Sequence, residues 1–514
     1  TTESGVYENI TVTVTDAGGL SANLTLANFT VLPDFSDSID QEIGSPSGLD
    51  SIESNLKLWL DAKSINNNNN SGLNDNDAIS TWLDLSGNES NVTQTSSGSQ
   101  PKYVANSFNG SAGVRFDGSN DYIWTESSNS LSKATIIVVT KLGNIDFSSS
   151  SNSGGAAVSI QQKGSNNFDA IVYHEHESAH RKFMHGSSGH SRLHISSITE
   201  TSTGPFIILD EVNTGAFKQY RNGVISSQAN KSETNKPNTR FIIGNRHFIS
   251  NTTTPVSNGY WDGDIQEVLI FDTVLTDNER SKINHYLAKK WGVTETVDSD
   301  GDGFTDAEEL AAGTSAADST EYPVPDFSDV VDSQTGINSG LDAVEDNLKV
   351  WLNSKNIDGK ENEGLSENDL IKRWVDLSGN WNSPEQTNTS YLPSFSKDSV
   401  YFNRDDVLIF PNEVAIGSSW DMYIVFDFSS HFHHSDWNTF FKGRSVDHHI
   451  LIQNGTNLIG SYDNSGNSGF RSSGININNY SGNNILRITG TGGSSTININ
   501  GVNSGSEFKQ VTVP

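Results

Sequence analysis

The feature that most constrains the fold of this 514-residue chain is an internal repeat. Residues 33–88 align with residues 325–380 at a constant offset of 292 residues and without a gap, and 31 of the 56 positions are identical. The segment WLDLSGN at 82–88 recurs as WVDLSGN at 374–380. Such a period is far above that of solenoid repeats, so the sequence predicts two copies of one domain.

Composition narrows the class of domain. Hydrophobic residues are 33% of the chain and charged residues 18%, with 45 glycines and no cysteine, which favours all-β domains with long polar loops. The net charge of −31 argues against nucleic acid and anionic lipid as partners. Without cysteine, disulfides and thiolate zinc sites are excluded. No apolar run predicts direct membrane insertion.

Alternating segments in the first copy predict an antiparallel sandwich, because Gly, Asn, Ser and Pro clusters separate them. A capping box at 276–279 then starts a helix with one apolar face, which Gly292 ends. We expect this helix to pack on the sandwich. The predicted strands are 113–117, 135–141, 156–161, 170–174, 206–210, 217–221, 240–244 and 264–272.

Between the two copies, residues 298–309 (DSDGDGFTDAEE) have the ligand spacing of an EF-hand-type calcium loop. Gly303 falls at position 6, where the chain must turn sharply. Five carboxylates this close repel one another, so we expect the loop to be ordered by metal; the alternative is a solvated acidic linker. The predicted calcium ligands are Asp298, Asp300, Asp302, the Phe304 carbonyl, Asp306 and Glu309.

Several segments carry family resemblances. The segments LKLWLDAKSI, STWLDLSGN, GVRFDGSNDYI and GDIQEVLIFDTVLTDNERSKINHYLAKKWG resemble a bacterial laminin G-like module of the concanavalin A-like jelly-roll superfamily. The resemblance covers the first copy from about 49 to 292. The second copy has no partner for 263–292. The loop with the following EELAAGT resembles a thrombospondin type 3 repeat, which implies a calcium-ordered connector.

These resemblances imply two antiparallel jelly-roll sandwiches, the second truncated. Residues 7–32 alternate twice around a turn at 16–19, which predicts a hairpin that resembles the closing strands of cadherin-like or immunoglobulin-like repeats. Because the chain starts at Thr1 and stops at Pro514 after a strand-like segment, we expect a longer multidomain protein. The expected segments are 1–32 (partial repeat), 33–48 (linker), 49–293 (first jelly roll), 294–324 (calcium linker), 325–340 (linker) and 341–514 (second jelly roll).

Three weaker sites follow from residue types. The turn at 117–122 could hold a ligand or a second calcium ion, or be a self-satisfied Asx turn. The histidines after the strand at 170–174 could bind a metal, or form a solvated polar loop. Loop aromatics are candidates for stacking on sugars. The residues concerned are Asp117, Asn120 and Asp121 for the turn, His174, His176 and His180 for the metal, and Trp124, Tyr260 and Trp261 for the sugar.

The leading functional hypothesis is a non-enzymatic extracellular module for adhesion or for recognition of a glycan or surface ligand, secreted by or attached to a bacterium, with calcium rigidifying the linker. One alternative is a purely structural stalk spacer. Another is a zinc hydrolase using His176, Glu177 and His180, which form a His-Glu-x-x-His match. That match follows a predicted strand rather than lying on a helix. Neither copy contains the Glu-x-Asp-x-x-Glu strand of jelly-roll glucanases, which weakens glycoside hydrolysis.

Overall fold

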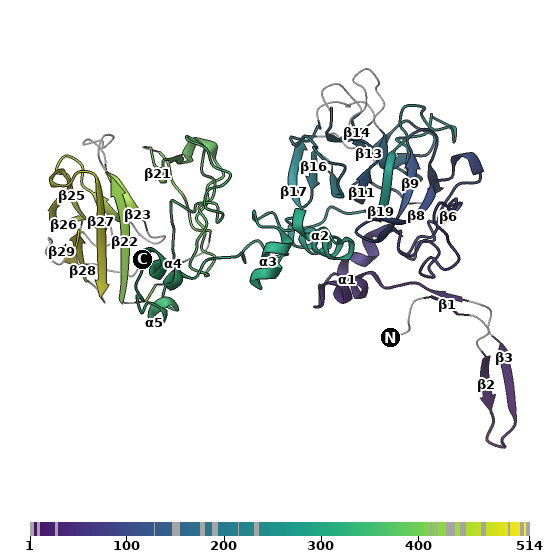
Figure 1. Ribbon diagram of the computed structural model, residues 1–514, viewed down its shortest axis with the longest axis horizontal. Helices are drawn as coiled ribbons and strands as arrows, with labels where there is room; N and C mark the ends of the chain where they lie inside the picture. Colours follow the sequence, from purple (N-terminus) through teal and green to yellow (C-terminus); the bar gives the residue numbers. More distant parts are fainter. Residues whose placement is uncertain are drawn as a thin grey trace. The chain divides into compact units, whose positions relative to one another are not determined.

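The chain forms two compact units, Thr1–Pro323 and Val324–Pro514 (Figure 1). Each unit has its own hydrophobic core. Antiparallel strands dominate both units, which confirms the predicted all-β class. The computed structural model describes residues 5–7, 11–25, 29–127, 129–145, 155–174, 180–187, 194–213, 215–230, 236–403, 405–411, 414, 416–417, 419–427, 437–442, 449–463, 469–491, 494–503 and 508–509.

Two antiparallel sheets face each other in the first unit, and buried side chains from both form one core. The larger sheet has the order β17-β16-β15-β11-β19-β9-β8, with β5 beside β19; the other has the order β14-β13-β12-β18-β10-β7-β6. Each of the eight predicted strands overlaps an observed one. The strands are β5 Leu56–Asp61, β6 Thr81–Trp82, β7 Val92–Thr93, β8 Lys102–Phe108, β9 Ser111–Asp117, β10 Ile123–Glu126, β11 Ala134–Leu142, β12 Ala156–Gln162, β13 Phe168–Tyr173, β14 Phe183–Ser187, β15 Phe206–Asn213, β16 Ala216–Arg221, β17 Val224–Ala229, β18 Thr239–Ile243 and β19 Asp262–Phe271.

Strands β11 and β19 lie at the centre of the larger sheet, and nearly all of their residues are buried on both faces. All of β11 except Lys141 is buried, and Val138 pairs with Val268 of β19. The predicted helix is α2 (Asp277–Trp291), with the Thr276 capping box and Gly292 in the left-handed conformation. Because one face of the sheet meets the second sheet and the helix packs against the other, an apolar strand is stable here.

A buried carboxylate fastens α2 to the sheet. Glu267 of β19 is 1% exposed. Its Oε1 accepts hydrogen bonds from Trp59 Nε1 at 2.9 Å and Tyr286 Oη at 3.1 Å. Its Oε2 accepts one from Trp291 Nε1 at 2.7 Å and lies 2.8 Å from Lys290 Nζ. Four donors therefore converge on one carboxylate, which satisfies a charge that burial would otherwise disfavour.

Residues 33–48, expected to be a linker, contain helix α1 (Phe35–Ile43), which is part of the first unit. Asp34 caps the helix by accepting a hydrogen bond from the Asp37 backbone N–H. Phe35 is 4% exposed and its ring lies edge-on to Trp59 at 5.2 Å between centroids. The segment is short and polar, so its two buried apolar side chains, Phe35 and Ile39, were too few to distinguish a packed helix from a linker by sequence.

The second unit contains a five-stranded and a four-stranded sheet. Its strand β22 pairs with β27 in the way that β11 pairs with β15, and among the described residues it has no partner on its other edge. Alternate residues of β22 are exposed, including Tyr423 and Val425. The elements are α4 Phe327–Thr335, α5 Asp342–Glu345, β20 Ser394–Ser396, β21 Ser399–Tyr401, β22 Ser419–Asp427, β23 Asn438–Lys442, β24 His449–Ile452, β25 Leu458–Asp463, β26 Gly469–Asn476, β27 Asn483–Thr491, β28 Ser494–Ile499, β29 Val502–Asn503 and β30 Phe508–Lys509.

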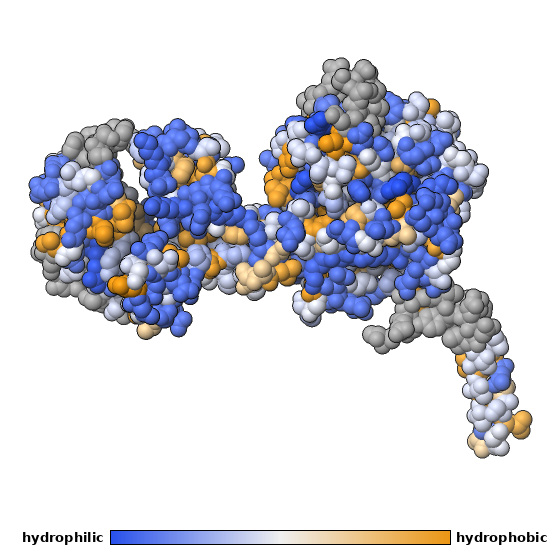
Figure 2. Space-filling model, viewed as in Figure 1, coloured by the Kyte–Doolittle hydropathy of each residue, from blue (hydrophilic) through white to orange (hydrophobic). Residues whose placement is uncertain are grey.

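The predicted N-terminal hairpin is present as β2 (Thr11–Thr15) paired with β3 (Ser21–Thr25), and β1 (Gly5–Tyr7) pairs with β4 (Phe29–Val31). Every described residue of β2 and β3 is exposed. Among the described residues, no helix has both the length and the apolar character to cross a membrane. Hydrophilic residues cover most of the visible surface (Figure 2).

The Glu267 cluster yields a stability prediction. Glu267→Ala should lower the free energy of unfolding by about 3–5 kcal/mol, because it leaves the indole N–H groups of Trp59 and Trp291 buried without their acceptor and removes one of the two carboxylates that pair with Lys290. Urea denaturation followed by tryptophan fluorescence measures this loss. Glu295→Ala, at an exposed position beyond α2, serves as the control and should change stability by less than about 0.5 kcal/mol. Equal effects of the two substitutions would contradict the role of the cluster.

Candidate calcium site

The acidic loop leads into a short, well-capped helix. Helix α3 (Asp306–Ala312) begins after Thr305, whose hydroxyl accepts a hydrogen bond from the Glu308 backbone N–H, and Glu308 reaches back to the Thr305 backbone N–H. Gly313 ends the helix in the left-handed conformation. Gly303, at the predicted turn, has φ of 107°, which a side chain would disfavour. The sequence therefore determines both ends of the loop through local contacts.

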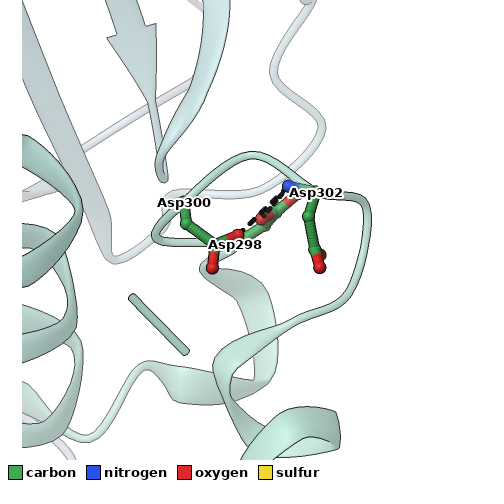
Figure 3. Close-up of side chains that lie close together, drawn as sticks. All are labelled: Asp298, Asp300 and Asp302. Atoms are coloured by element: carbon green, nitrogen blue, oxygen red, sulfur yellow. Dashed lines mark hydrogen bonds between the residues drawn. The ribbon is translucent and has the colours of Figure 1, made fainter. Parts of the chain in front are cut away.

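Three aspartates gather within this loop. Asp298, Asp300 and Asp302 each place one carboxylate oxygen within 4.8 Å of the others, and Figure 3 shows that all three side chains come from the same turn of chain. Asp298 accepts hydrogen bonds from the backbone N–H groups of Gly301, Asp302 and Gly303 at 2.8, 3.1 and 3.0 Å. Hydrogen bonds from the backbone of the loop itself thus orient the Asp298 carboxylate.

Glu309, in the first turn of α3, is a fourth carboxylate that interacts with these three, and it lies outside the group whose oxygens are all within 4.8 Å of one another. It is 0% exposed, and neither of its carboxylate oxygens has a hydrogen-bond partner. Asp300 Oδ2 is likewise buried without a partner. Burial, reinforced by the neighbouring carboxylates, raises the pKa of Glu309 to about 10 and that of Asp300 to about 8. Burial also raises the pKa of Asp298 to about 6. The donor set therefore fits a hard cation with oxygen ligands.

Asp306, the predicted ligand at position 9, has a different set of contacts. It is 0% exposed, and its Oδ1 accepts a hydrogen bond from the Ser299 backbone N–H at 2.9 Å. Its Oδ2 contacts Ser299 Oγ at 2.9 Å and His285 Nδ1 of α2 at 2.8 Å. Asp306 therefore ties the loop to α2, and it lies outside the group of three aspartates. The Phe304 side chain is buried and stacks on Tyr322, with 6.1 Å between ring centroids.

The loop is fastened to the first sandwich as well as to α2. The Asp298 backbone N–H donates to the Asn222 carbonyl at 3.1 Å, in the turn between β16 and β17. Asn222 Nδ2 donates to the Thr296 carbonyl at 2.9 Å. At the next residue, Gly223, a Cβ would lie 1.7 Å from the Asp298 carbonyl oxygen. The calcium loop, expected to be a connector between domains, thus belongs to the first unit.

The turn at 117–122 has its own hydrogen bonds. Asp117 Oδ1 accepts from the backbone N–H groups of Ser119, Asn120 and Asp121 at 2.9, 3.1 and 3.3 Å, which is an Asx turn. Asp121 is 6% exposed and accepts from the Asp117 backbone N–H. Burial and the Asp117 charge raise the pKa of Asp121 to about 6. Among the described residues, these carboxylates are not part of a metal-sized group.

The histidine sites are described in part. His174 is buried, its Nδ1 accepts from the Arg181 backbone N–H at 3.2 Å, and its ring lies 4.6 Å from that of His180. His176 and Glu177 lie outside the described residues. The metal-site and zinc-hydrolase predictions, which need them, therefore stay predictions.

Of the aromatic residues expected to stack on sugars, Trp124 and Tyr260 are partly exposed. Trp261, immediately before β19, is 1% exposed and belongs to the core, so its ring is not open to a sugar as predicted: the position in a loop did not reveal its burial. Sequence reasoning also missed Tyr122, which is partly exposed beside Tyr260. Its two-residue spacing from Trp124 was the available signal, since residues i and i+2 of a strand share a face.

Comparison with known proteins identifies the loop segment. Residues 298–314 match the family described as bacterial TSP3 repeat. No curated protein matches the chain. Similar solved structures include domain 4 of AbnA, a GH43 extracellular arabinanase from Geobacillus stearothermophilus, in complex with arabinotriose, with 15% identity over 43% of this chain and 94% of that chain and a TM-score of 0.29.

Two further solved structures are similar to parts of the chain. A Trypanosoma rangeli sialidase in complex with 2,3-difluorosialic acid has 10% identity over 46% of this chain and 33% of that chain, with a TM-score of 0.31. A pentraxin from Limulus polyphemus has 11% identity over 32% of this chain and 76% of that chain, with a TM-score of 0.22. The family match therefore gives the loop, and the loop alone, an identity: it is a bacterial TSP3 repeat.

Proposed function

We propose that this chain is a non-enzymatic extracellular binding module whose first sandwich recognises a carbohydrate or surface ligand and is stabilised by calcium bound in residues 298–309. The observation that carries the calcium assignment is Glu309, a buried carboxylate with no partner for either oxygen. An isolated buried charge is strongly unfavourable, and a divalent cation in the same loop removes that penalty.

The ligand set suits calcium. Asp298, Asp300, Asp302 and Glu309 would supply carboxylate oxygens, and Phe304 its main-chain carbonyl, as in loops of this spacing. Oxygen ligands without thiolate or imidazole favour calcium over zinc or copper. Asp306 would hold the loop against α2 through Ser299 and His285 rather than complete the coordination. The TSP3 match over 298–314 supports the same assignment.

Calcium at this position would act on the first sandwich itself. The loop contacts the turn at Asn222 and helix α2. By neutralising the carboxylates, calcium would stabilise the loop in the conformation that makes these contacts. We further propose that both copies are laminin G-like modules, arranged in tandem in a larger adhesin-like protein. A structural spacer would use calcium in the same way but would bind no ligand.

Calcium should therefore raise the melting temperature of the first unit. Ligand at one hundred times its Kd stabilises a protein by about 2.7 kcal/mol. Glu309→Gln should abolish most of this gain, and it should also raise the melting temperature in chelator, because it removes a buried carboxyl that must take up a proton when the metal-free protein folds. Differential scanning calorimetry with calcium or with EGTA measures both effects.

Glu295→Gln, exposed and three residues before the loop, is the matched control and should keep the full calcium response. A wild-type protein whose melting is the same in calcium and in EGTA would contradict the calcium assignment.

The carboxylate pKa values predict that the stability of the first unit depends on pH in opposite directions without and with calcium. Without metal, carboxyls whose folded pKa is raised stabilise the protein when protonated, and this stabilisation is lost as pH rises through about 6, 8 and 10. Calcium requires the deprotonated forms. The calcium-dependent rise in melting temperature should therefore increase between about pH 5 and about pH 8. A rise that is constant or that decreases over this range would contradict the prediction.

Gly223 tests the coupling between loop and sandwich. In Gly223→Ala the new Cβ would meet the Asp298 carbonyl, so the loop must leave the turn. Calcium binding measured by titration calorimetry should persist or weaken modestly, while the calcium-dependent rise in melting temperature should fall by at least half. Gly215→Ala is the matched control, since Gly215 has φ of 84° against 87° at Gly223 but nothing within 4 Å of its Cβ position. Similar behaviour of both variants would contradict the coupling.

A further inference from the structure

Two tyrosines form an open corner on the outer face of the smaller sheet in the first sandwich. Along β10, Ile123 is 0% exposed and faces the core, so Tyr122 and Trp124 lie on the opposite face. Tyr122 and Tyr260 are both partly exposed, with 6.4 Å between ring centroids and 47° between ring planes. Buried Phe248 lies edge-on to Tyr122, with 5.7 Å between ring centroids, and packs against the Tyr122 ring.

The neighbouring Trp124 supports the corner rather than extends it. It lies edge-on to Phe248 at 5.1 Å, and the Arg240 guanidinium lies 5.6 Å from its ring centroid. Arg240 is itself held by Glu126 at 3.1 Å. Trp124 is partly exposed as well, but the Arg240 guanidinium lies over its ring, so we assign the corner to the rings of Tyr122 and Tyr260.

Polar groups line the same corner. The Gly118 backbone N–H donates to the Trp261 carbonyl at 2.8 Å, which brings the turn that begins at Asp117 beside the segment that carries Tyr260. Burial, and then repulsion from Tyr122 and Asp117, raise the pKa of Tyr260. Asp117 is exposed at the end of β9, and its Asx turn fixes its position. In the described part of the chain, neither tyrosine hydroxyl donates to a protein group. Asp262 pairs with Asp117 across the β9–β19 ladder, and Asp117 repels both Asp121 and Asp262, so three carboxylates gather here, with Lys102 and Arg115 as neighbouring cations.

The second copy provides an internal comparison. The sequence FDGSNDYI at 116–123 corresponds to FNRDDVL at 402–408, because two residues lie between Asn403 and Asp406 where three lie between Asp117 and Asp121. Val407 therefore follows Asp406 where Tyr122 follows Asp121. An apolar side chain such as Val407 is enough to cover the sheet at this position. The second copy therefore lacks the aromatic ring and hydroxyl that Tyr122 adds, and the corner is specific to the first copy.

We propose that Tyr122 and Tyr260 bind one sugar ring of a neutral glycan, with its apolar C–H face against the rings and its hydroxyls donating to Asp117. Aromatic rings and a carboxylate acceptor are complementary to a sugar in these two respects. The carboxylates of Asp117, Asp121 and Asp262 repel uronic and sialic acids, so the ligand carries no negative charge. This inference rests on the proposed binding function and names its ligand class and site.

The test uses the full chain in millimolar calcium. Binding to linear arabinan, laminarin, amylose and galactomannan, and to the anionic alginate and polygalacturonate, is measured by affinity electrophoresis and titration calorimetry. At least one neutral glycan should bind, and Tyr122→Ala and Tyr260→Ala should each weaken its Kd by on the order of tenfold or more. Tyr401→Ala, an exposed tyrosine of the second unit, is the control and should leave the Kd unchanged.

The outcomes separate the site from the function. The calcium-dependent melting shift of each variant should match that of the wild type, which shows that the first unit is folded. Neutral-glycan binding that survives both tyrosine substitutions overturns the site and leaves the binding function standing. Preferential binding of alginate or polygalacturonate overturns the ligand class. No binding to any of the six glycans overturns both the ligand class and the recognition part of the proposed function, while the calcium assignment is judged by melting alone.

Discussion

The Glu267 carboxylate is the interaction on which the C-terminal part of the first unit depends. By accepting hydrogen bonds from Trp59, Tyr286 and Trp291, it holds α2 on the outer face of the larger sheet. His285 of the same helix then contacts Asp306, which places the acidic loop. Glu267 thus positions α2, and α2 in turn positions the proposed calcium site. The cluster is costly to bury and is stable because every oxygen has donors.

The two copies show which parts of the module depend on that helix. The turn around Asp84 accepts the Trp59 backbone N–H at 3.0 Å, and Asp376 accepts that of Trp351 at 2.8 Å. This local structure therefore forms in both copies. Trp59 is 2% exposed, whereas Trp351 is only partly buried. Because the second unit, as described, has no counterpart of β19 and α2 against this face, its tryptophan keeps a partly open side.

Sequence predicted the local features and missed those that depend on long-range contacts. The alternation of apolar residues predicted the long strands, and the capping box at Thr276 predicted the start of α2. The spacing of Asp298, Asp300 and Asp302 brought together the same three carboxylates that the structure gathers. The role of Asp306 was not accessible, since its partner His285 lies 21 residues away on another element. The buried position of Trp261 depends on sheet pairing, which residue type does not reveal.

The close approach at Gly223 has a consequence for sequence variation among related chains. The position has no direct contact with the proposed ion, yet any side chain there would occupy the space of the Asp298 carbonyl. Chains that preserve this docking should therefore retain glycine at the β16–β17 turn as strictly as they retain the acidic residues of the loop. Loss of that glycine would mark the relatives in which the repeat has become detached from its sandwich, even where all of its carboxylates remain.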